Sequence, residues 1–122
     1  MTRAERQFER LVATIGRLSD SPDAQQEYLS DLGTQGLTDE LALEFDDALQ
    51  PLRHQFEVLG VSASVVSRIE ALANVLSAMG GADREWLWRP ESLGSPEWSK
   101  VREIAADILE ALGVRGDEAP DP

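Results

Sequence analysis

The chain has 122 residues, a length typical of one domain, and carries 23 acidic residues against 11 basic ones for a formal net charge of −12. It has no cysteine and one histidine, which excludes a disulfide framework, a thiolate metal site, a cysteine nucleophile and the common multi-histidine metal sites. The negative charge argues against direct nucleic-acid binding, because phosphate contacts need clustered lysine and arginine.

The N-terminus predicts no export signal. It is charged within three residues and has no apolar run. No stretch of roughly 18 apolar residues occurs anywhere in the chain, so the sequence predicts no membrane-spanning helix and no membrane partner. We therefore expect a cytoplasmic protein.

The chain opens with two predicted helices. Apolar side chains recur at helical spacing between Phe8 and Leu18 and predict a helix over residues 2–19. Ser21 is followed by proline and aspartate, which is typical of an N-cap, and the shorter helix that it begins should end at Gly33. Residues 34–37 are a predicted linker.

The third predicted helix begins after Thr38 as its cap. Apolar residues keep one helical phase from Leu41 to Leu59, and Gly60 should end the helix. Pro51 interrupts this run, removes one backbone donor and clashes with the preceding turn. Because the apolar phase continues past Pro51, we expect a kinked helix rather than two separate ones.

The fourth predicted helix is unusually apolar. It begins at a cap formed by Ser62 or Ser64 and runs to Met79, with one arginine and one glutamate on the way. A helix with so few charges is usually buried on most sides, so we expect it to be the central helix of the bundle.

The rest of the chain is predicted to hold an irregular segment, one more helix and a tail. Residues 82–94 lack a clear period, and Ser95 caps a helix with an apolar stripe that ends at Gly113. The sequence shows no strand pattern. We predict an all-α fold, a compact bundle of about five helices with a kinked third helix, as a single domain over residues 1–113, with a disordered acidic C-terminal tail over 114–122.

The sharpest feature of the sequence is its charge distribution. Residues 20–50 hold nine acidic residues and no basic one. On the third helix Glu40, Glu44 and Asp47 lie at positions i, i+4 and i+7, with Asp39 and Asp46 on their flanks. Such a face either keeps the protein in solution or binds and steers a basic partner.

A third interpretation of the acidic face is internal pairing. The first helix carries several arginines (Arg3, Arg6, Arg10 and Arg17). They could face the acidic helix of the same chain or of a dimer mate. Exposed pairs of this kind would add only about 0–1 kcal/mol each.

All three tryptophans lie close together in the sequence. Trp98 falls on the apolar stripe of the last helix and is predicted to be core. Trp86 and Trp88 are two residues apart and do not easily face the same way, so we expect one to pack inward and the other to be an exposed anchor for a partner. The alternative is that both rings close the end of the bundle.

Nothing in the sequence predicts catalysis or a cofactor. His54 has no nucleophile-elbow serine or phosphate loop to act with, and we expect it at the surface. Carboxylate pairs such as Glu40 and Glu44 could hold a hard cation, but no known metal-binding spacing is present. The turn at Gly60 has helix-turn-helix spacing, but the helix after it lacks the basic residues that DNA recognition needs. We therefore predict a protein that is not an enzyme and has no catalytic residue, metal or cofactor.

Two functions follow as hypotheses. The first is an acidic binding protein that presents the carboxylates of the third helix, with Trp86 or Trp88, to a basic protein partner. By analogy, small acidic helical proteins of bacteria include immunity proteins that inhibit basic nuclease toxins. The alternative is a structural or assembly module, such as a homodimer, that uses apolar residues lying off the main stripes, namely Leu43 and Leu87. A third hypothesis is that the protein carries a small ligand in a pocket under the tryptophan segment.

Overall fold

The computed structural model describes residues 2–33, 38–80 and 82–113. These residues form five α-helices, three short 3₁₀-helices and no strand, so the predicted all-α class is confirmed. The α-helices are α1 (Arg3–Ser19), α2 (Pro22–Leu32), α3 (Asp39–Leu49), α4 (Ala63–Ala78) and α5 (Pro96–Leu112). The 3₁₀-helices are η1 (Gln50–Leu52), η2 (Ala82–Trp88) and η3 (Pro90–Gly94). The predicted linker 34–37 and the predicted acidic tail 114–122 lie outside the described residues.

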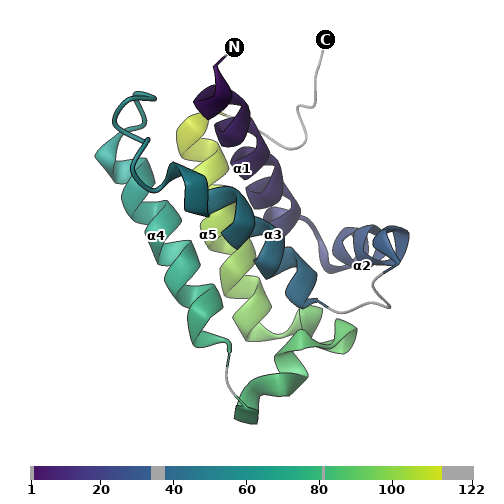
Figure 1. The fold of residues 1–122 in the computed structure, drawn as a ribbon. Coiled ribbons are helices and arrows are strands. Elements are labelled where there is room, and N and C mark those ends of the chain that lie inside the picture. Colours follow the sequence, from purple (N-terminus) through teal and green to yellow (C-terminus); the bar gives the residue numbers. More distant parts are fainter. Residues whose placement is uncertain (1, 34–37, 81, 114–122) are drawn as a thin grey trace.

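Helix α5 holds the bundle together. It packs along both α1 and α4, and α3 crosses in front of it while packing on α1 (Figure 1). Helix α2 lies to the side of the bundle and contacts η3. The prediction that the apolar fourth helix is central is therefore wrong, because α5 occupies that place. Much of the apolar character of α4 comes from alanines, several of which face outward.

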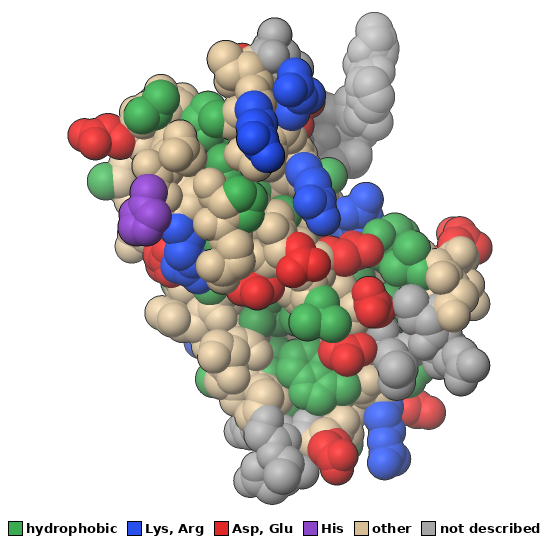
Figure 2. Space-filling view, viewed as in Figure 1, with side chains coloured by type: hydrophobic (Ala, Val, Ile, Leu, Met, Phe, Trp, Pro, Cys, Tyr) green, Lys and Arg blue, Asp and Glu red, His purple; other side chains and the backbone are tan. Residues whose placement is uncertain are grey.

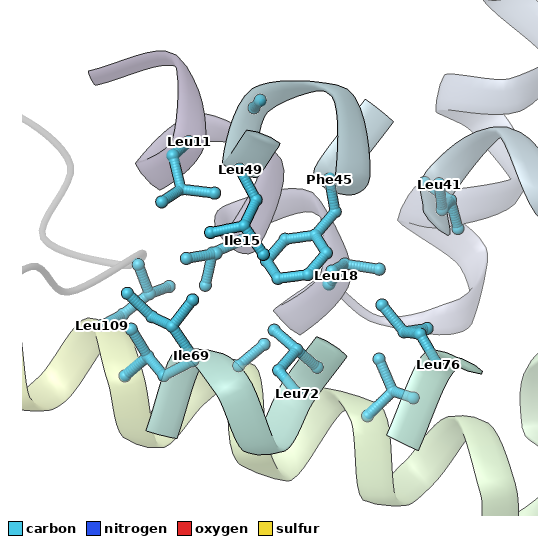
Figure 3. Packing of buried hydrophobic residues seen from close by; sticks show 14 of the residues in the cluster. Leu11, Ile15, Leu18, Leu41, Phe45, Leu49, Ile69, Leu72, Leu76 and Leu109 are labelled. Atoms are coloured by element: carbon cyan, nitrogen blue, oxygen red, sulfur yellow. The ribbon is translucent and has the colours of Figure 1, made fainter. Parts of the chain in front are cut away.

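The core draws apolar side chains, mostly leucine and isoleucine, from all five α-helices, and Figure 3 shows the part of it around Phe45. Leu11 and Ile15 of α1 meet Phe45 of α3, and Ile69 of α4 closes the layer. Each of these side chains is at most a few per cent exposed. The apolar stripes predicted for these helices are the stripes that the fold buries.

Most helix ends follow the capping chemistry that the sequence predicts, but the prediction for Thr38 is wrong: its side chain makes no cap hydrogen bond to α3, because its hydroxyl donates to the carbonyl of Leu87 instead. Ser21, Ser62 and Ser95 each accept a hydrogen bond from a backbone N–H in the first turn of the helix that follows. Gly33 and Gly113 end α2 and α5 with φ of 72° and 80°, a left-handed conformation in which a side chain would be strained.

The third helix is shorter than predicted. Regular α-helix ends at Leu49, η1 contains Pro51, and residues 53–60 form turns. A single kinked helix that continues to Leu59 is therefore not clearly shown. Proline cannot complete the α-helical hydrogen bonds at this point. The apolar phase nevertheless persists, since Phe56 in the turns is still buried.

The segment predicted to be irregular, residues 82–94, is organised around one backbone oxygen. The carbonyl of Leu87 accepts hydrogen bonds from Thr38 Oγ1 at 3.1 Å, Ser92 Oγ at 2.7 Å and Trp98 Nε1 at 2.8 Å. Because these donors come from three different parts of the chain, this oxygen fixes η2 against the start of α3 and the start of α5. The same anchor positions Trp88 beside α3.

Candidate functional site

The acidic residues of α3 are divided between two sides of the helix. Figure 2 shows acidic side chains over α3 beside an apolar patch, whereas basic side chains lie over α1. One side of α3 faces α2, and the other side faces α4 and η2. We call them the α2 side and the α4 side of α3. The two sides have different neighbours in the fold.

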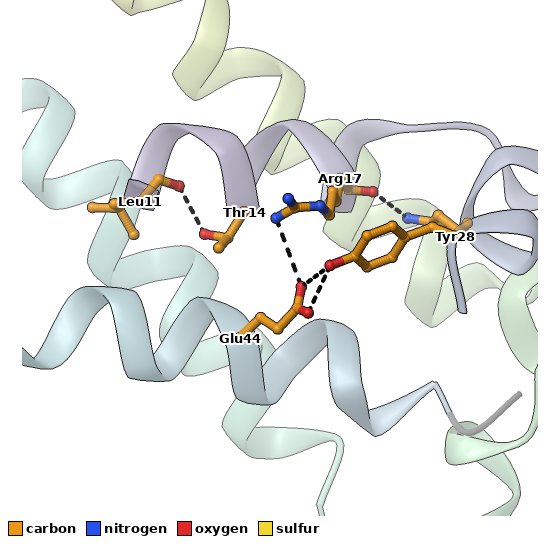
Figure 4. Close-up of polar contacts among 6 residues, drawn as sticks. Leu11, Thr14, Arg17, Tyr28 and Glu44 are labelled. Atoms are coloured by element: carbon orange, nitrogen blue, oxygen red, sulfur yellow. Dashed lines mark hydrogen bonds and ion pairs between the residues drawn. The ribbon is translucent and has the colours of Figure 1, made fainter. Parts of the chain in front are cut away.

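On the α2 side, Glu44 is held by two residues of the fold. The hydroxyl of Tyr28 donates to both carboxylate oxygens of Glu44, at 2.9 Å to Oε1 and 2.6 Å to Oε2. Arg17 Nη1 lies 3.7 Å from Glu44 Oε1, and the Arg17 guanidinium carbon lies 4.6 Å from the centre of the Tyr28 ring (Figure 4). The internal pairing between the arginines of the first helix and the acidic helix is thus present at Arg17.

The electrostatics of this cluster favour the neutral phenol. Partial burial raises the pKa of Tyr28, and its hydrogen bond to Glu44 raises it further. Arg17 opposes this effect, while the charges of Glu44 and Glu40 add to it. The cluster is a structural contact that joins α1, α2 and α3.

On the α4 side, α3 borders an open apolar groove of about 330 Å³. Its α3 wall is formed by Asp39, Ala42, Leu43, Phe45 and Asp46. Its opposite wall is formed by Ala73, Leu76, Ser77, Gly80 and Trp88. The groove exists because α4 offers mainly small residues here, which leave the space between the helices unfilled.

Leu43 is the exposed apolar residue of this groove. Its side chain is 51% exposed, although it sits on a helix whose other leucines, Leu41 and Leu49, are buried. Asp39 and Asp46 lie one helical turn away from it on either side and also line the groove. An exposed leucine between two carboxylates combines an apolar contact surface with a negatively charged border.

The predicted carboxylates therefore have different surroundings. Asp39 and Asp46 line the groove, and Asp46 Oδ1 also accepts from Gln50 Nε2 at 3.0 Å. Asp47 is exposed and Glu40 is half-buried, with a charge that acts on Tyr28. Glu44 is already bound by Tyr28 and Arg17. The i, i+4, i+7 set that borders the groove is Asp39, Leu43 and Asp46, not Glu40, Glu44 and Asp47.

Of the two neighbouring tryptophans, one packs inward and the other is exposed, but the exposed ring, which was predicted to be the anchor, does not line the groove. Trp88 packs edge-on against the buried Trp98, with ring centres 5.9 Å apart and an interplanar angle of 86°, and its exposed part lines the groove. Trp86 is 48% exposed and is not among the residues that line the groove. The ring that belongs to the candidate site is therefore Trp88.

Leu87, which was predicted to be an apolar contact for self-assembly, is fully buried. That prediction is wrong. Leu87 lies between Trp86 and Trp88 in the sequence, and the turn geometry of η2 points its side chain into the core. Of the two off-stripe leucines, Leu43 is the one that reaches the surface.

The described residues contain neither a metal-binding cluster nor a membrane-spanning helix. Within residues 2–33, 38–80 and 82–113, no three histidine, aspartate or glutamate side chains are grouped closely enough to hold a metal ion. His54 is exposed and borders a second, wider hollow with Arg53 and Glu57. In the same described ranges, no helix has the length and apolar character needed to cross a bilayer.

Two parts of this region were missed at the level of sequence. The hydrogen bond between Tyr28 and Glu44 joins residues 16 positions apart, on different helices, and no local pattern indicates it. The far wall of the groove was also missed. It had a partial signal, since Ala73 and Ser77 lie at i and i+4 on α4, and Gly80 follows just beyond the end of that helix. Small residues at that spacing make a shallow strip along one face of a helix.

Comparison of the chain with protein-family models, with curated proteins and with solved structures finds no match.

Proposed function

We propose that the protein binds a basic protein partner through the α4 side of α3. The observation that carries this proposal is the apolar groove with the half-exposed Leu43, bordered by Asp39 and Asp46. An exposed apolar centre with a charged border is the usual composition of a protein interface. The partner surface that complements it carries apolar and positively charged side chains.

The net charge of −12 supports a basic partner over a second copy of the chain. Two copies that met through Leu43 would bring the carboxylates of Asp39 and Asp46 from both chains together, and like charges across an interface are strongly unfavourable. A positively charged partner would instead be steered toward this face, with an association rate that falls as salt is added. Homodimerisation through this groove is therefore the weaker candidate.

The role of Glu44 differs from that of the groove acids. Because Tyr28 and Arg17 occupy its carboxylate, we assign Glu44 to positioning α3 rather than to contacting the partner. Asp47 and Glu40 contribute to the field around α3 without lining the groove. A substitution at Glu44 would disturb the fold, so it is a poor test of binding.

The test is capture of partners from the lysate of the native cell by the tagged protein. The capture is done at about 50 mM and about 500 mM salt and read by mass spectrometry. We expect a basic protein that is retained at low salt, is weakened at high salt, and is lost with Asp39→Asn/Asp46→Asn. The matched control is Glu103→Gln/Asp107→Asn, which removes two charges from exposed positions on α5.

Two outcomes would contradict the proposal. One is that no basic protein is retained, or that only self-association is seen. The other is that the α5 control weakens capture as much as the groove variant does. If the captured partner is a nuclease, the immunity-type interpretation predicts that adding the protein suppresses its cleavage of nucleic acid.

A further inference from the structure

The groove is large enough to hold one or two side chains of a partner protein, but too small to hold a whole domain. Its volume is about 330 Å³, at the lower end of the roughly 300–1,000 Å³ typical of ligand sites. Its lining includes the apolar side chains of Phe45, Leu76 and Trp88. A protruding apolar side chain of a partner can fill such a space.

The charges sit at two defined points along the groove. Asp39 and Asp46 are seven residues apart on α3, which places them about 10 Å apart along the helix axis. Leu43 lies between them, and among the residues that the structure describes, no lysine, arginine or histidine lines the groove. A complementary segment therefore needs positive charge at both ends and an apolar side chain in the middle.

A helix satisfies this geometry, whereas an added strand does not. The groove walls are helices, whose backbone N–H and C=O groups are already paired along their lengths, and the described residues contain no sheet edge for a peptide to extend. A helix covers about 10 Å in seven residues. Basic residues at positions i and i+7, with an apolar residue at i+3 or i+4 on the same face, match Asp39, the groove and Asp46.

We propose that the groove between α3 and α4 takes an amphipathic basic helix of the partner protein. One large apolar side chain of that helix packs against Leu43 and Trp88, and lysine or arginine side chains one turn before and after it pair with Asp39 and Asp46. This inference rests on the binding function proposed above and specifies which segment of the partner is recognised.

The probe is a displayed library of helical peptides with one randomised face, selected on the wild-type protein. We expect enriched peptides to carry an apolar residue with lysine or arginine three or four positions to either side. Leu43→Asp should weaken the selected peptides at least tenfold. Leu43→Ser, which adds no charge, should weaken them less but clearly, since it removes the apolar contact alone.

Three matched measurements sharpen the test. Asp39→Asn/Asp46→Asn should weaken binding several-fold and reduce its salt dependence. Val58→Asp changes an apolar residue that is 81% exposed and lies outside the groove, and it should leave the affinity unchanged. The α5 variant Glu103→Gln/Asp107→Asn should also leave it unchanged.

The inference is overturned if no helical peptide is enriched, if enriched peptides lack basic residues at this spacing, or if Val58→Asp weakens them as much as Leu43→Asp. Its failure is distinguishable from failure of the proposed function. If a captured basic partner depends on Asp39 and Asp46 but is neither weakened by Leu43→Asp nor displaced by the peptides, the helix proposal is wrong and the binding function stands. If no basic partner is captured, both are wrong.

Discussion

On the α2 side of α3, Glu44 is bound by Tyr28 and Arg17, while on the α4 side Asp39 and Asp46 border a groove around an exposed leucine. Both sides are acidic and belong to the same 11-residue helix. They differ in what the neighbouring helices supply. A tyrosine and an arginine fill the space on one side, and alanine, serine and glycine leave it open on the other.

The difference shows that a run of acidic residues is not one functional unit. A carboxylate that accepts hydrogen bonds from a phenol within the fold contributes to stability. A carboxylate at the border of an empty apolar groove adds repulsion to a chain that is already strongly negative, unless a partner supplies positive charge. The two sides are therefore expected to differ in how strongly the same kinds of substitution change folding stability.

The largest change in folding stability is expected for Tyr28→Ala on the α2 side. Truncating a fully buried phenylalanine costs about 3–5 kcal/mol. Because Tyr28 is only half-buried but also loses its contacts with Glu44 and Arg17, we expect about 2 kcal/mol. Urea denaturation followed by circular dichroism measures this. Val58→Ala, at a well-exposed site, is the control and should cost about 0.5 kcal/mol or less. If Tyr28→Ala and Val58→Ala lost the same folding stability, Tyr28 would not make the contacts with Glu44 and Arg17 described above.

A matched pair of carboxylate substitutions compares the two sides directly. Glu44→Gln keeps the shape of the side chain but weakens the charge-assisted bond from Tyr28, so unfolding should become easier by about 1 kcal/mol. Asp46→Asn removes a charge from the open side and should change stability by no more than about 0.5 kcal/mol in either direction. If Asp46→Asn is as destabilising as Glu44→Gln, the proposed difference between the two sides of α3 is wrong.

The pH dependence of stability gives a further distinction. The pKa of Tyr28 is raised above its ordinary value of 10.0 in the folded state, first by burial and then by Glu44. The stability that the neutral phenol contributes is therefore fully present below pH 10.0, and it is lost as pH rises through the folded-state pKa. Tyr28→Phe should lack this loss. A tyrosinate absorbance titration reads Tyr28 alone, because the chain has one tyrosine.

In that titration the midpoint should lie above 10.0 and should move part of the way back in Glu44→Gln. A midpoint at or below 10.0 in the wild-type protein would contradict the contact between Tyr28 and Glu44.

The smallest change in stability is expected from filling the groove. Ser77→Leu places a larger side chain in the open space and replaces serine with a better helix former, so stability should stay level or rise by about 0.5 kcal/mol. The affinity for the partner or for the selected peptides should nevertheless fall at least tenfold, because the leucine introduced at position 77 would occupy the space that their apolar side chain needs. A variant that is clearly destabilised would show that the space is not available, and an unchanged affinity would show that the groove is not used.

Much of the fold could be predicted because its signals are local. Each serine cap binds an N–H three residues away, and each apolar stripe lies on a single helix, so both are visible in a short window of sequence. The break at Pro51 was located correctly, although regular helix ends there instead of bending. Proline marks the place in the sequence, but the packing of the following residues decides whether the helix continues.

The candidate site was only partly predictable because it depends on contacts between helices. Asp39, Asp46 and Trp88 were singled out by charge and by residue type, and they do line the groove. Glu44 was indistinguishable from them in sequence, since only the fold brings Tyr28 to it. The position of α4 at the edge of the bundle was missed because hydropathy counts alanine as apolar whether it faces the core or solvent.

The measurement that most directly tests the account is a map of backbone amide and tryptophan indole NMR shifts in the labelled protein as the captured basic partner is added. The account predicts shift changes over residues 39–46 and 73–80 and at the indole of Trp88, with the surroundings of Tyr28 unchanged. Changes confined to the turns and helix at 53–67, or to the start of α1 beside Val58, would contradict it.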